Sequence, residues 1–318
     1  MKNAIVKKIL SAAAAVSLIA SAAAFSAHAA SDGTFEYGTK DPFGMEYGAI
    51  VITKYLGSDS NIVFPATLDE QPVEYVFLEF DKDVSLEFSE GFQSLPYMNF
   101  IHIPKDGKDD RGRVISVKLP ESLTTLKTEK LGGTFEGYKN LESINLPEGL
   151  YEIPDDTFRD CEKLKSIEIP KNVEIIKGDA FNNCISLETV VMTGGVTTIK
   201  ERAFNYCTGL KTITLPNTLK EIVGKSVFAH CDSLQTVNYM GTEEEFDQIT
   251  MKPDVKAFLK PKINYVSADT TFTINSSGEV VQSSSSNLTL IIILCVGGVV
   301  LVALLIVIVA FISKKKKQ

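Results

Sequence analysis

The sequence contains no tryptophan, and only three of its 318 residues are histidines. His28 lies near the N-terminus, while His102 and His230 lie far apart in the rest of the chain. No H-E-x-x-H, G-x-S-x-G or glycine-rich phosphate-binding motif occurs, and no serine, histidine and aspartate follow the order of a catalytic triad. We therefore predict no catalytic residue, no metal ligand and no cofactor, and we keep an enzyme only as a remote alternative.

Acidic residues are absent from the first part of the chain, which has the features of a secretion signal. Lys2, Lys7 and Lys8 precede an apolar, alanine-rich stretch at residues 9–25. Ala-His-Ala at residues 27–29 is a small-x-small cleavage site. We predict that residues 1–29 are a signal peptide that is removed on export.

A second stretch, residues 288–312, has no charged residue over 25 positions. As a helix it would be about 37 Å long, which is enough to cross about 30 Å of hydrocarbon with some tilt. Four lysines follow at residues 314–317, so the positive-inside rule places the tail, residues 313–318, in the cytoplasm. We predict a single-pass protein of the cell membrane, with one C-terminal transmembrane helix and most of the chain extracellular.

The remainder of the chain is strongly acidic. The signal and the tail carry seven lysines and no acidic residue, which leaves 40 acidic against 25 basic residues and a net charge of −15. A surface of this sign repels polyanions. Nucleic acid is therefore excluded as a main partner, whereas basic proteins are compatible with this charge.

Four nearly identical segments occupy residues 144–234. They read INLPEGLYEIPDDTFRDCEKL, IEIPKNVEIIKGDAFNNCISL, VVMTGGVTTIKERAFNYCTGL and ITLPNTLKEIVGKSVFAHCDSL. Their first residues, together with the start of the next segment, are spaced by 23, 23, 23 and 24 positions: Ile144, Ile167, Val190, Ile213 and Val237. A fixed period of this length is typical of a solenoid, in which each repeat packs against its neighbours as one rung.

Four of the five cysteines recur at one position of the repeat: Cys161, Cys184, Cys207 and Cys231. Two earlier rungs have Leu95 and Tyr138 at this position, so it is an apolar core position, where free cysteine behaves as a small hydrophobic residue. The spacing also lacks the C-x₂-C pairs of zinc sites. We predict a ladder of buried free thiols, with disulfides between neighbouring rungs as the alternative. Cys295, in the uncharged stretch, is predicted to be a packing residue.

Shorter segments flank the regular repeats. Residues 30–47 are polar and glycine-rich, and we expect an irregular lead-in there. Thr242 and Glu245 have the spacing of a capping box, which predicts a short helix after the repeats. We predict an N-terminal capping module at residues 30–76, the solenoid at 77–239, a C-terminal cap at 240–265 and a flexible serine- and threonine-rich stalk at 266–287.

The repeat resembles that of the BspA-like leucine-rich repeat family of bacterial surface proteins. The family pattern I-x-I-P-x-x-V-x-x-I-x-x-x-A-F-x-x-C-x-x-L is present as IEIPKNVEIIKGDAFNNCISL, and ITKYLGSDSNIVFPATLDEQPV and VNYMGTEEEF are similar to flanking parts of the family. The resemblance implies a mainly β, right-handed leucine-rich-repeat solenoid with short helical turns, no catalytic residues and a role in protein binding. Unlike many relatives, the chain has no L-P-x-T-G beside its hydrophobic stretch.

Outward positions of the predicted strands form columns of small, mostly polar side chains. Alternation places Ile167 and Ile169 inward and their neighbours outward. We name the following residues the binding face: Lys118, Ser143, Asn145, Ser166, Glu168, Thr189, Val191, Thr212, Thr214, Thr236 and Asn238. Such a face suits an extended protein segment, although serine and threonine also stabilise strand surfaces without a ligand. A neighbouring column alternates in charge and predicts ion pairs between rungs: Glu142, Lys165, Glu188 and Lys211.

These features favour a membrane-anchored cell-surface protein that binds a protein ligand through the binding face, in adhesion or recognition. The ligand classes are host matrix, another bacterium or an envelope protein, and residues 288–312 contact the membrane. The alternative is a structural spacer or envelope-organising protein that acts within the cell wall.

Overall fold

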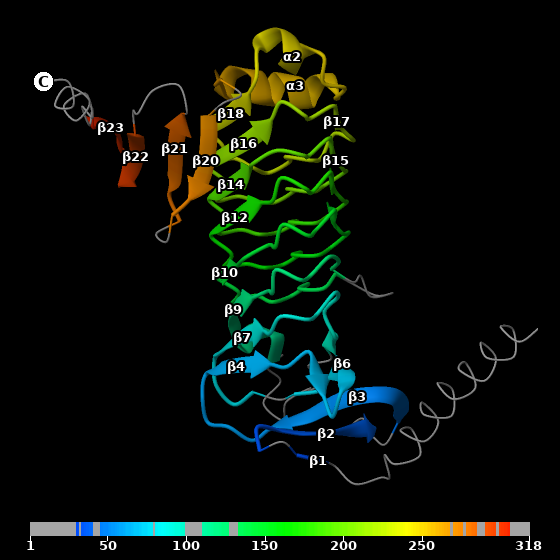
Figure 1. Cartoon of the computed structure of the whole chain (residues 1–318). Helices are drawn as coiled ribbons and strands as arrows, with labels where there is room; N and C mark the ends of the chain where they lie inside the picture. Colours follow the sequence, from blue (N-terminus) through cyan, green and yellow to red (C-terminus); the bar gives the residue numbers. More distant parts are fainter. Residues whose placement is uncertain are drawn as a thin grey trace, which may run out of the picture. The chain divides into compact units, whose positions relative to one another are not determined.

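The structure is a computed structural model of the chain (Figure 1), and it describes residues 30–31, 33–40, 45–78, 80–98, 110–126, 133–267, 270–275, 278–284, 290–296 and 299–305. The predicted signal peptide and the predicted cytoplasmic tail lie outside the described residues. The chain divides into two compact units. Residues 1–60, 65–81 and 95–110 form the first unit, and residues 61–64, 82–94 and 111–318 form the second.

The first unit is built around a six-stranded sheet. Its strands are β1 (Ala30–Ser31), β2 (Phe35–Lys40), β3 (Glu46–Tyr55), β6 (Gln71–Val76) and β5 (Thr67–Leu68) in spatial order, with β8 (Tyr97–Met98) also paired to β6. Strand β2 corrects the prediction of an irregular lead-in. Phe35 and Tyr37 alternate with Glu36 and Gly38, and both aromatic side chains are buried, so this stretch has the period of a half-buried strand.

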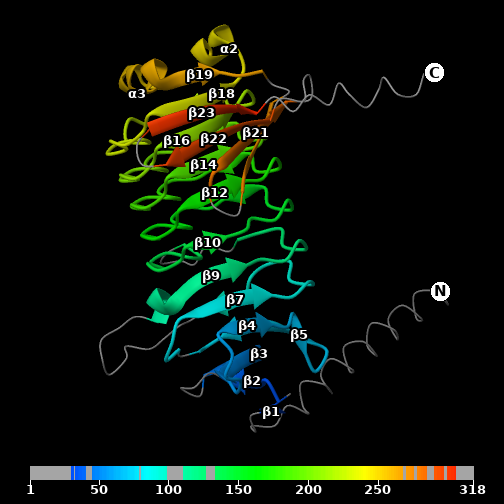
Figure 2. The same cartoon turned by 90° about the vertical axis from the view of Figure 1, so that its left-hand side faces the viewer.

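The second unit contains the repeats, and equivalent residues of successive rungs pair in parallel (Figures 1 and 2). The binding face lies on two parallel sheets: β4 (Asn61–Phe64), β7 (Val84–Phe88), β9 (Val114–Lys118) and β10 (Ser143–Ile144), then β12 (Ser166–Ile169), β14 (Thr189–Met192), β16 (Thr212–Pro216) and β18 (Thr236–Met240). The opposite side carries β11 (Glu152–Ile153), β13 (Ile175–Ile176), β15 (Thr198–Ile199) and β17 (Glu221–Ile222). A short 3-10 helix, η1 (Asp110–Arg113), precedes β9. The predicted mainly β solenoid is confirmed.

Stacked phenylalanine rings form the centre of the second unit. Phe158, Phe181 and Phe204 are fully buried, and their centroids are separated by 5.1 and 5.2 Å in nearly parallel stacks. Cysteine thiols lie beside the rings, and the Sγ of Cys184 donates to the carbonyl oxygen of Phe158 at 3.1 Å. The four repeat cysteines are free and buried, which confirms the thiol ladder. The repeated Phe and Cys therefore hold the rungs together through aromatic and apolar contacts.

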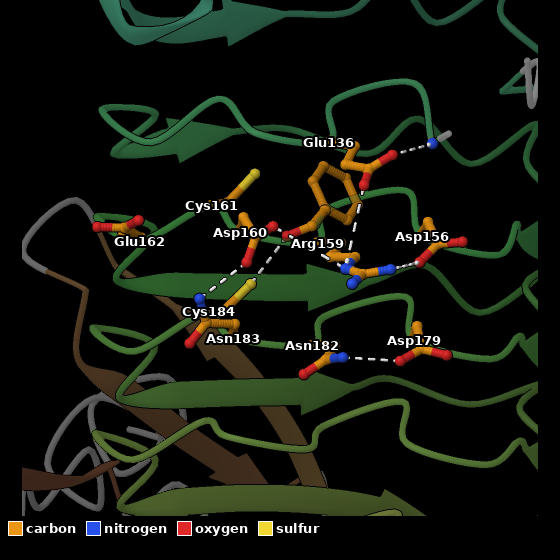
Figure 3. Close-up of polar contacts among 12 residues, drawn as sticks. Glu136, Asp156, Arg159, Asp160, Cys161, Glu162, Asp179, Asn182, Asn183 and Cys184 are labelled. Carbon is orange, nitrogen blue, oxygen red and sulfur yellow. Dashed lines mark hydrogen bonds and ion pairs between the residues drawn. The ribbon is translucent and has the colours of Figure 1, made fainter. Parts of the chain in front are cut away.

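Left-handed residues form the turns between the two sides of each rung. Asp156 and Asp160 have φ values of 55° and 60°, and aspartate tolerates this conformation better than most residues. The guanidinium of Arg159 lies 3.2 Å from Asp156, 3.9 Å from Asp160 and 4.0 Å from Glu136 (Figure 3). The Asn183 amide donates to the Asp160 carboxylate at 2.8 Å. These polar contacts connect each turn to its neighbours.

A helical cap closes the array after β18. It consists of α2 (Glu243–Asp247), α3 (Pro253–Leu259), the 3-10 helix η2 (Lys260–Lys262) and β19 (Ile263–Tyr265), which pairs with β18. The predicted capping box is present, because the Thr242 hydroxyl accepts from the Glu245 amide at 3.2 Å and the Glu245 carboxylate accepts from the Thr242 amide at 2.9 Å. Phe246 is buried and contacts Tyr239 edge-on. The cap thus covers the last rung.

The predicted flexible stalk contains a β-hairpin instead. Strands β20 (Thr270–Ile274) and β21 (Val280–Ser284) pair antiparallel, with Thr270 opposite Ser284 and Ile274 opposite Val280. Gly278, which has a φ of 82°, lies in the connection, where glycine meets no steric penalty. The alternation of threonine with Phe272 and Ile274 explains the strand, since it gives β20 one apolar face.

The predicted transmembrane helix also differs from the structure. Its described part forms β22 (Leu290–Val296) and β23 (Val299–Leu305), which pair antiparallel, and β22 also pairs with β21. Many valine and isoleucine residues, which favour strands, explain this conformation. No helix within the described ranges is long and apolar enough to cross a membrane. Residues 306–312 lie outside those ranges.

Candidate protein-binding face

The binding-face residues lie on, or directly after, strands β9, β10, β12, β14, β16 and β18. Alternation along the strands places them as predicted, because Ile167 and Ile169 are buried while Ser166 and Glu168 are partly exposed. The structure therefore brings the predicted residues together on one side of the second unit. Their exposure, however, divides the face into an open part on β9 and β10 and a covered part on β14, β16 and β18.

Lys118, Ser143 and Asn145 form the open part, and all three are exposed. The Lys118 ammonium lies 2.6 Å from a carboxylate oxygen of Glu87 on the neighbouring strand. The Asn145 amide accepts from the backbone nitrogen of Leu119 at 2.8 Å and donates to its carbonyl oxygen at 3.0 Å. Asn145 thus continues the hydrogen bonding between β9 and β10, while Ser143 is accessible to a ligand.

The covered part contains side chains that point away from the solenoid core and are nevertheless buried. Val191 and Thr214 each have 0% exposure, and Thr189 and Asn238 are also buried. The Asn264 amide of β19 donates to the Asn238 side-chain oxygen at 3.2 Å. The Thr214 hydroxyl has no hydrogen-bond partner among the described residues. Another part of the chain must therefore exclude water from this surface.

The hairpin formed by β20 and β21, which we call the covering hairpin, provides this contact at Val191. Strand β20 contacts β12 and β14, and Figure 1 shows it beside the strands of the binding face. Phe272 is only 2% exposed and packs in one cluster with Val191 and Met240. The partly buried residues around this cluster are Val266, Ile274 and Val280. The expected polar face therefore includes an apolar patch, Val191 and Met240, which an aromatic ring covers.

Glu168 makes a polar contact with the same hairpin. Its carboxylate accepts a hydrogen bond from the backbone amide of Ile274 at 3.3 Å. Burial raises the pKa of Glu168, and the nearby charge of Glu148 raises this pKa further, while the Ile274 amide partly offsets both effects. Within the described residues, the hairpin is thus held by the apolar cluster around Phe272 and by a hydrogen bond from the Ile274 backbone amide, which any residue except proline could donate.

A cavity of about 310 Å³ lies where the covering hairpin meets the open part of the face. The lining residues include Ile274 of the hairpin and, from the solenoid, Ser143, Asn145, Glu148, Ser166 and Glu168. No group of three or more His, Cys, Asp or Glu side chains in the described ranges could hold a metal ion. The two carboxylates and the hydroxyls suit a polar or cationic group rather than an anion.

The charged column beside the face forms ion pairs between rungs. Lys165 lies 2.8 Å from Glu142, and Lys211 lies 2.8 Å from Glu188, as the alternating charges predict. All four side chains are largely exposed, so each pair contributes little to stability, on the order of 1 kcal/mol or less. This column has its partners within the chain and is not a strong candidate for ligand binding.

The covering hairpin was not predicted from the sequence. Its signals are present in the sequence as T-T-F-T-I, then N-S-S-G, then V-V. These are a strand, a turn and a second strand. The Asn275 side chain stabilises the turn, because its oxygen accepts from the Glu279 amide at 2.9 Å. A high content of serine and threonine obscured this pattern.

Comparisons with known proteins identify the repeat. Residues 131–252 match the model of the BspA type leucine rich repeat region in six copies. No curated protein matches the chain. Among solved structures, a leucine rich repeat protein of T. pallidum is 22% identical, with 76% of this chain and 100% of that chain covered and a TM-score of 0.43.

Two further structures are similar to this chain. A leucine rich cell surface protein of Faecalibacterium prausnitzii is 19% identical, with 80% of this chain and 60% of that chain covered and a TM-score of 0.37. The pneumococcal vaccine antigen PcpA is 16% identical, with 68% and 69% covered and a TM-score of 0.30. On the repeat match, residues 131–252 form a BspA-type leucine-rich repeat region.

Proposed function

We propose that this chain is a cell-surface protein that binds another protein through the binding face. The observation that carries this proposal is that the face already holds an extended segment, with Phe272 buried against Val191. A sheet surface that buries an aromatic side chain of its own chain has the shape and chemistry to bury one from a partner. Leucine-rich repeat proteins generally mediate protein–protein contacts, which agrees with this role.

We further propose that the solenoid is extracellular and attached to the cell membrane. Support comes from the secretion signal at residues 1–29 and from the uncharged residues 288–312, which four lysines follow. In hydrocarbon, an open sheet edge such as the one at β23 leaves backbone amides without partners, whereas a helix satisfies them. We therefore infer that residues 288–312 adopt a membrane-spanning helix on insertion.

The proposed binding face is tested by photo-crosslinking in living cells. A photoreactive amino acid replaces Ser143 in the open part of the face, and in a control chain it replaces Tyr151, which is 54% exposed just before β11 on the opposite side. We expect an adduct with a different protein from position 143 and none from position 151. Adducts from position 151 alone would place binding on the other side of the solenoid.

A second measurement separates adhesion from a role inside the wall. Antibodies against the cap helices α2 and α3 are applied to intact cells and to cells whose wall has been digested. Labelling of intact cells supports contact with host matrix or with another bacterium. Labelling that appears only after digestion supports an envelope partner or the structural alternative, and it rules out adhesion.

A further inference from the structure

We propose that the covering hairpin is an internal occupant of the ligand site, and that the partner is an extended segment with an aromatic residue followed two positions later by an aliphatic one. These two side chains would lie where Phe272 and Ile274 lie now. The inference rests on the proposed function, because it names the kind of partner that the binding face accepts. It also implies that the hairpin must leave the face before that partner binds.

The aromatic position is defined by the apolar patch that Phe272 covers. Val191 projects outward from β14 and Met240 ends β18, and both are buried with the Phe272 ring. Without the hairpin, the solenoid would expose these apolar side chains amid serine and threonine. An aromatic ring is the side chain that buries the most apolar area at such a site, which makes it the anchor of a partner segment.

The aliphatic position follows from the geometry of an extended chain. Residues i and i+2 of a strand point to the same side, so Phe272 and Ile274 both face the solenoid. Ile274 is partly buried at the edge of the cluster and also lines the 310 Å³ cavity. Its backbone amide donates to Glu168 at 3.3 Å. Any extended segment in this register presents an equivalent amide, so Glu168 would bind a partner as it binds the hairpin.

The hairpin is positioned to detach without disruption of the solenoid. Within the described ranges, β20 and β21 belong to a separate sheet with β22 and β23, and they pair with no strand of the repeats. Removal of the hairpin from the face therefore breaks no ladder hydrogen bond of the solenoid. Detachment loses the burial of Phe272 and its neighbours and the hydrogen bond to Glu168. A matching partner segment would restore both.

The test uses the full chain and a fluorescent peptide with the sequence of residues 266–284, and it measures binding by fluorescence anisotropy. We expect the peptide to bind a Phe272→Ala chain at least about tenfold more tightly than the unchanged chain, because the tethered hairpin then competes less for the site. A Phe258→Ala chain, altered on the helix α3, should bind as weakly as the unchanged chain. The same peptide with Phe272→Ala should bind neither.

Two further measurements keep the proposal falsifiable. Adding Val191→Arg to the Phe272→Ala chain should abolish peptide binding, with folding checked by circular dichroism. In the unchanged chain the Ile274 amide should be protected from hydrogen exchange, and Phe272→Ala should remove this protection. Equal peptide binding by both chains, or an unprotected Ile274 amide in the unchanged chain, would overturn the proposal.

These outcomes are independent of whether a cellular partner is found. Peptide binding tests the occupied site with a segment of the chain itself. Failure to crosslink a partner from position 143 would contradict the proposed function and leave the peptide result intact. Crosslinking of a partner without any peptide binding would support the function and overturn the role of the hairpin.

Discussion

Replacement of Phe181 by alanine tests whether the ring stack holds the solenoid together. The Phe181 ring has 0% exposure and lies between Phe158 and Phe204, with centroids 5.1 and 5.2 Å away. Truncation of a buried phenylalanine to alanine costs about 3–5 kcal/mol. Because Phe158 and Phe204 each lose a stacked neighbour, we expect a value near the upper end of that range, about 4–5 kcal/mol.

Urea unfolding followed by circular dichroism measures this change in the free energy of unfolding. Tyr151→Ala is the control, since that ring is 54% exposed and its hydroxyl donates to the exposed Glu174 carboxylate at 2.8 Å. We expect the control to lose far less free energy of unfolding, because its side chain is on the surface. A loss below about 1.5 kcal/mol for Phe181→Ala would refute the view that the stacked rings, rather than the strand pairing, hold adjacent rungs together.

Two further predictions concern titratable groups. Burial raises the pKa of the Cys231 thiol to about 12 and raises the pKa of Cys184 well above its ordinary value. In a Cys295→Ser chain, therefore, no thiol should react with an aromatic disulfide reagent at pH 8 until denaturant is added. Rapid reaction of the native chain would contradict the buried ladder. Burial also raises the pKa of Glu168 when the face is occupied, so hairpin binding should be fully stabilised below the ordinary carboxyl pKa and weaken as pH rises through the raised value. Glu168→Gln in the Phe272→Ala chain should flatten the pH profile of peptide binding, and the peptide should bind this variant more tightly at pH 7. An unchanged profile would show that Glu168 is not the titrating group.

The sequence was sufficient to predict the rungs because their cause is local. Alternation in Ser166-Ile167-Glu168-Ile169 decides which side chains face the core, and the period of 23 decides what each residue meets in the next rung. The same argument explains why Cys184 is a buried thiol, since every rung repeats the apolar surroundings of its neighbour. Little in these contacts depends on residues outside two adjacent repeats.

The cover over the binding face could not be predicted in this way. Glu168 and the amide of Ile274 are 106 positions apart, and no periodicity links them. Outward alternation predicts that Val191 faces solvent, and only the tertiary contact with Phe272 explains why an outward valine is buried. A single valine in a column of polar residues was the one local sign of an apolar contact on this face.

Because successive rungs are equivalent, the chain can lose one whole repeat without a break in the stack. Deletion of residues 181–203 would join Ala180 to Phe204, so that the Phe204 ring occupies the place of Phe181 and the remaining rungs stack as before. The covering hairpin follows the C-terminal cap in the chain, so it would shift by one rung, about 4.8 Å, relative to the rungs before the deletion. Phe272 would then meet Glu168 in place of Val191. Gain or loss of one whole repeat would therefore preserve the fold and change the residue that contacts the aromatic ring. A change in repeat number alone would then alter ligand preference between descendants of one gene.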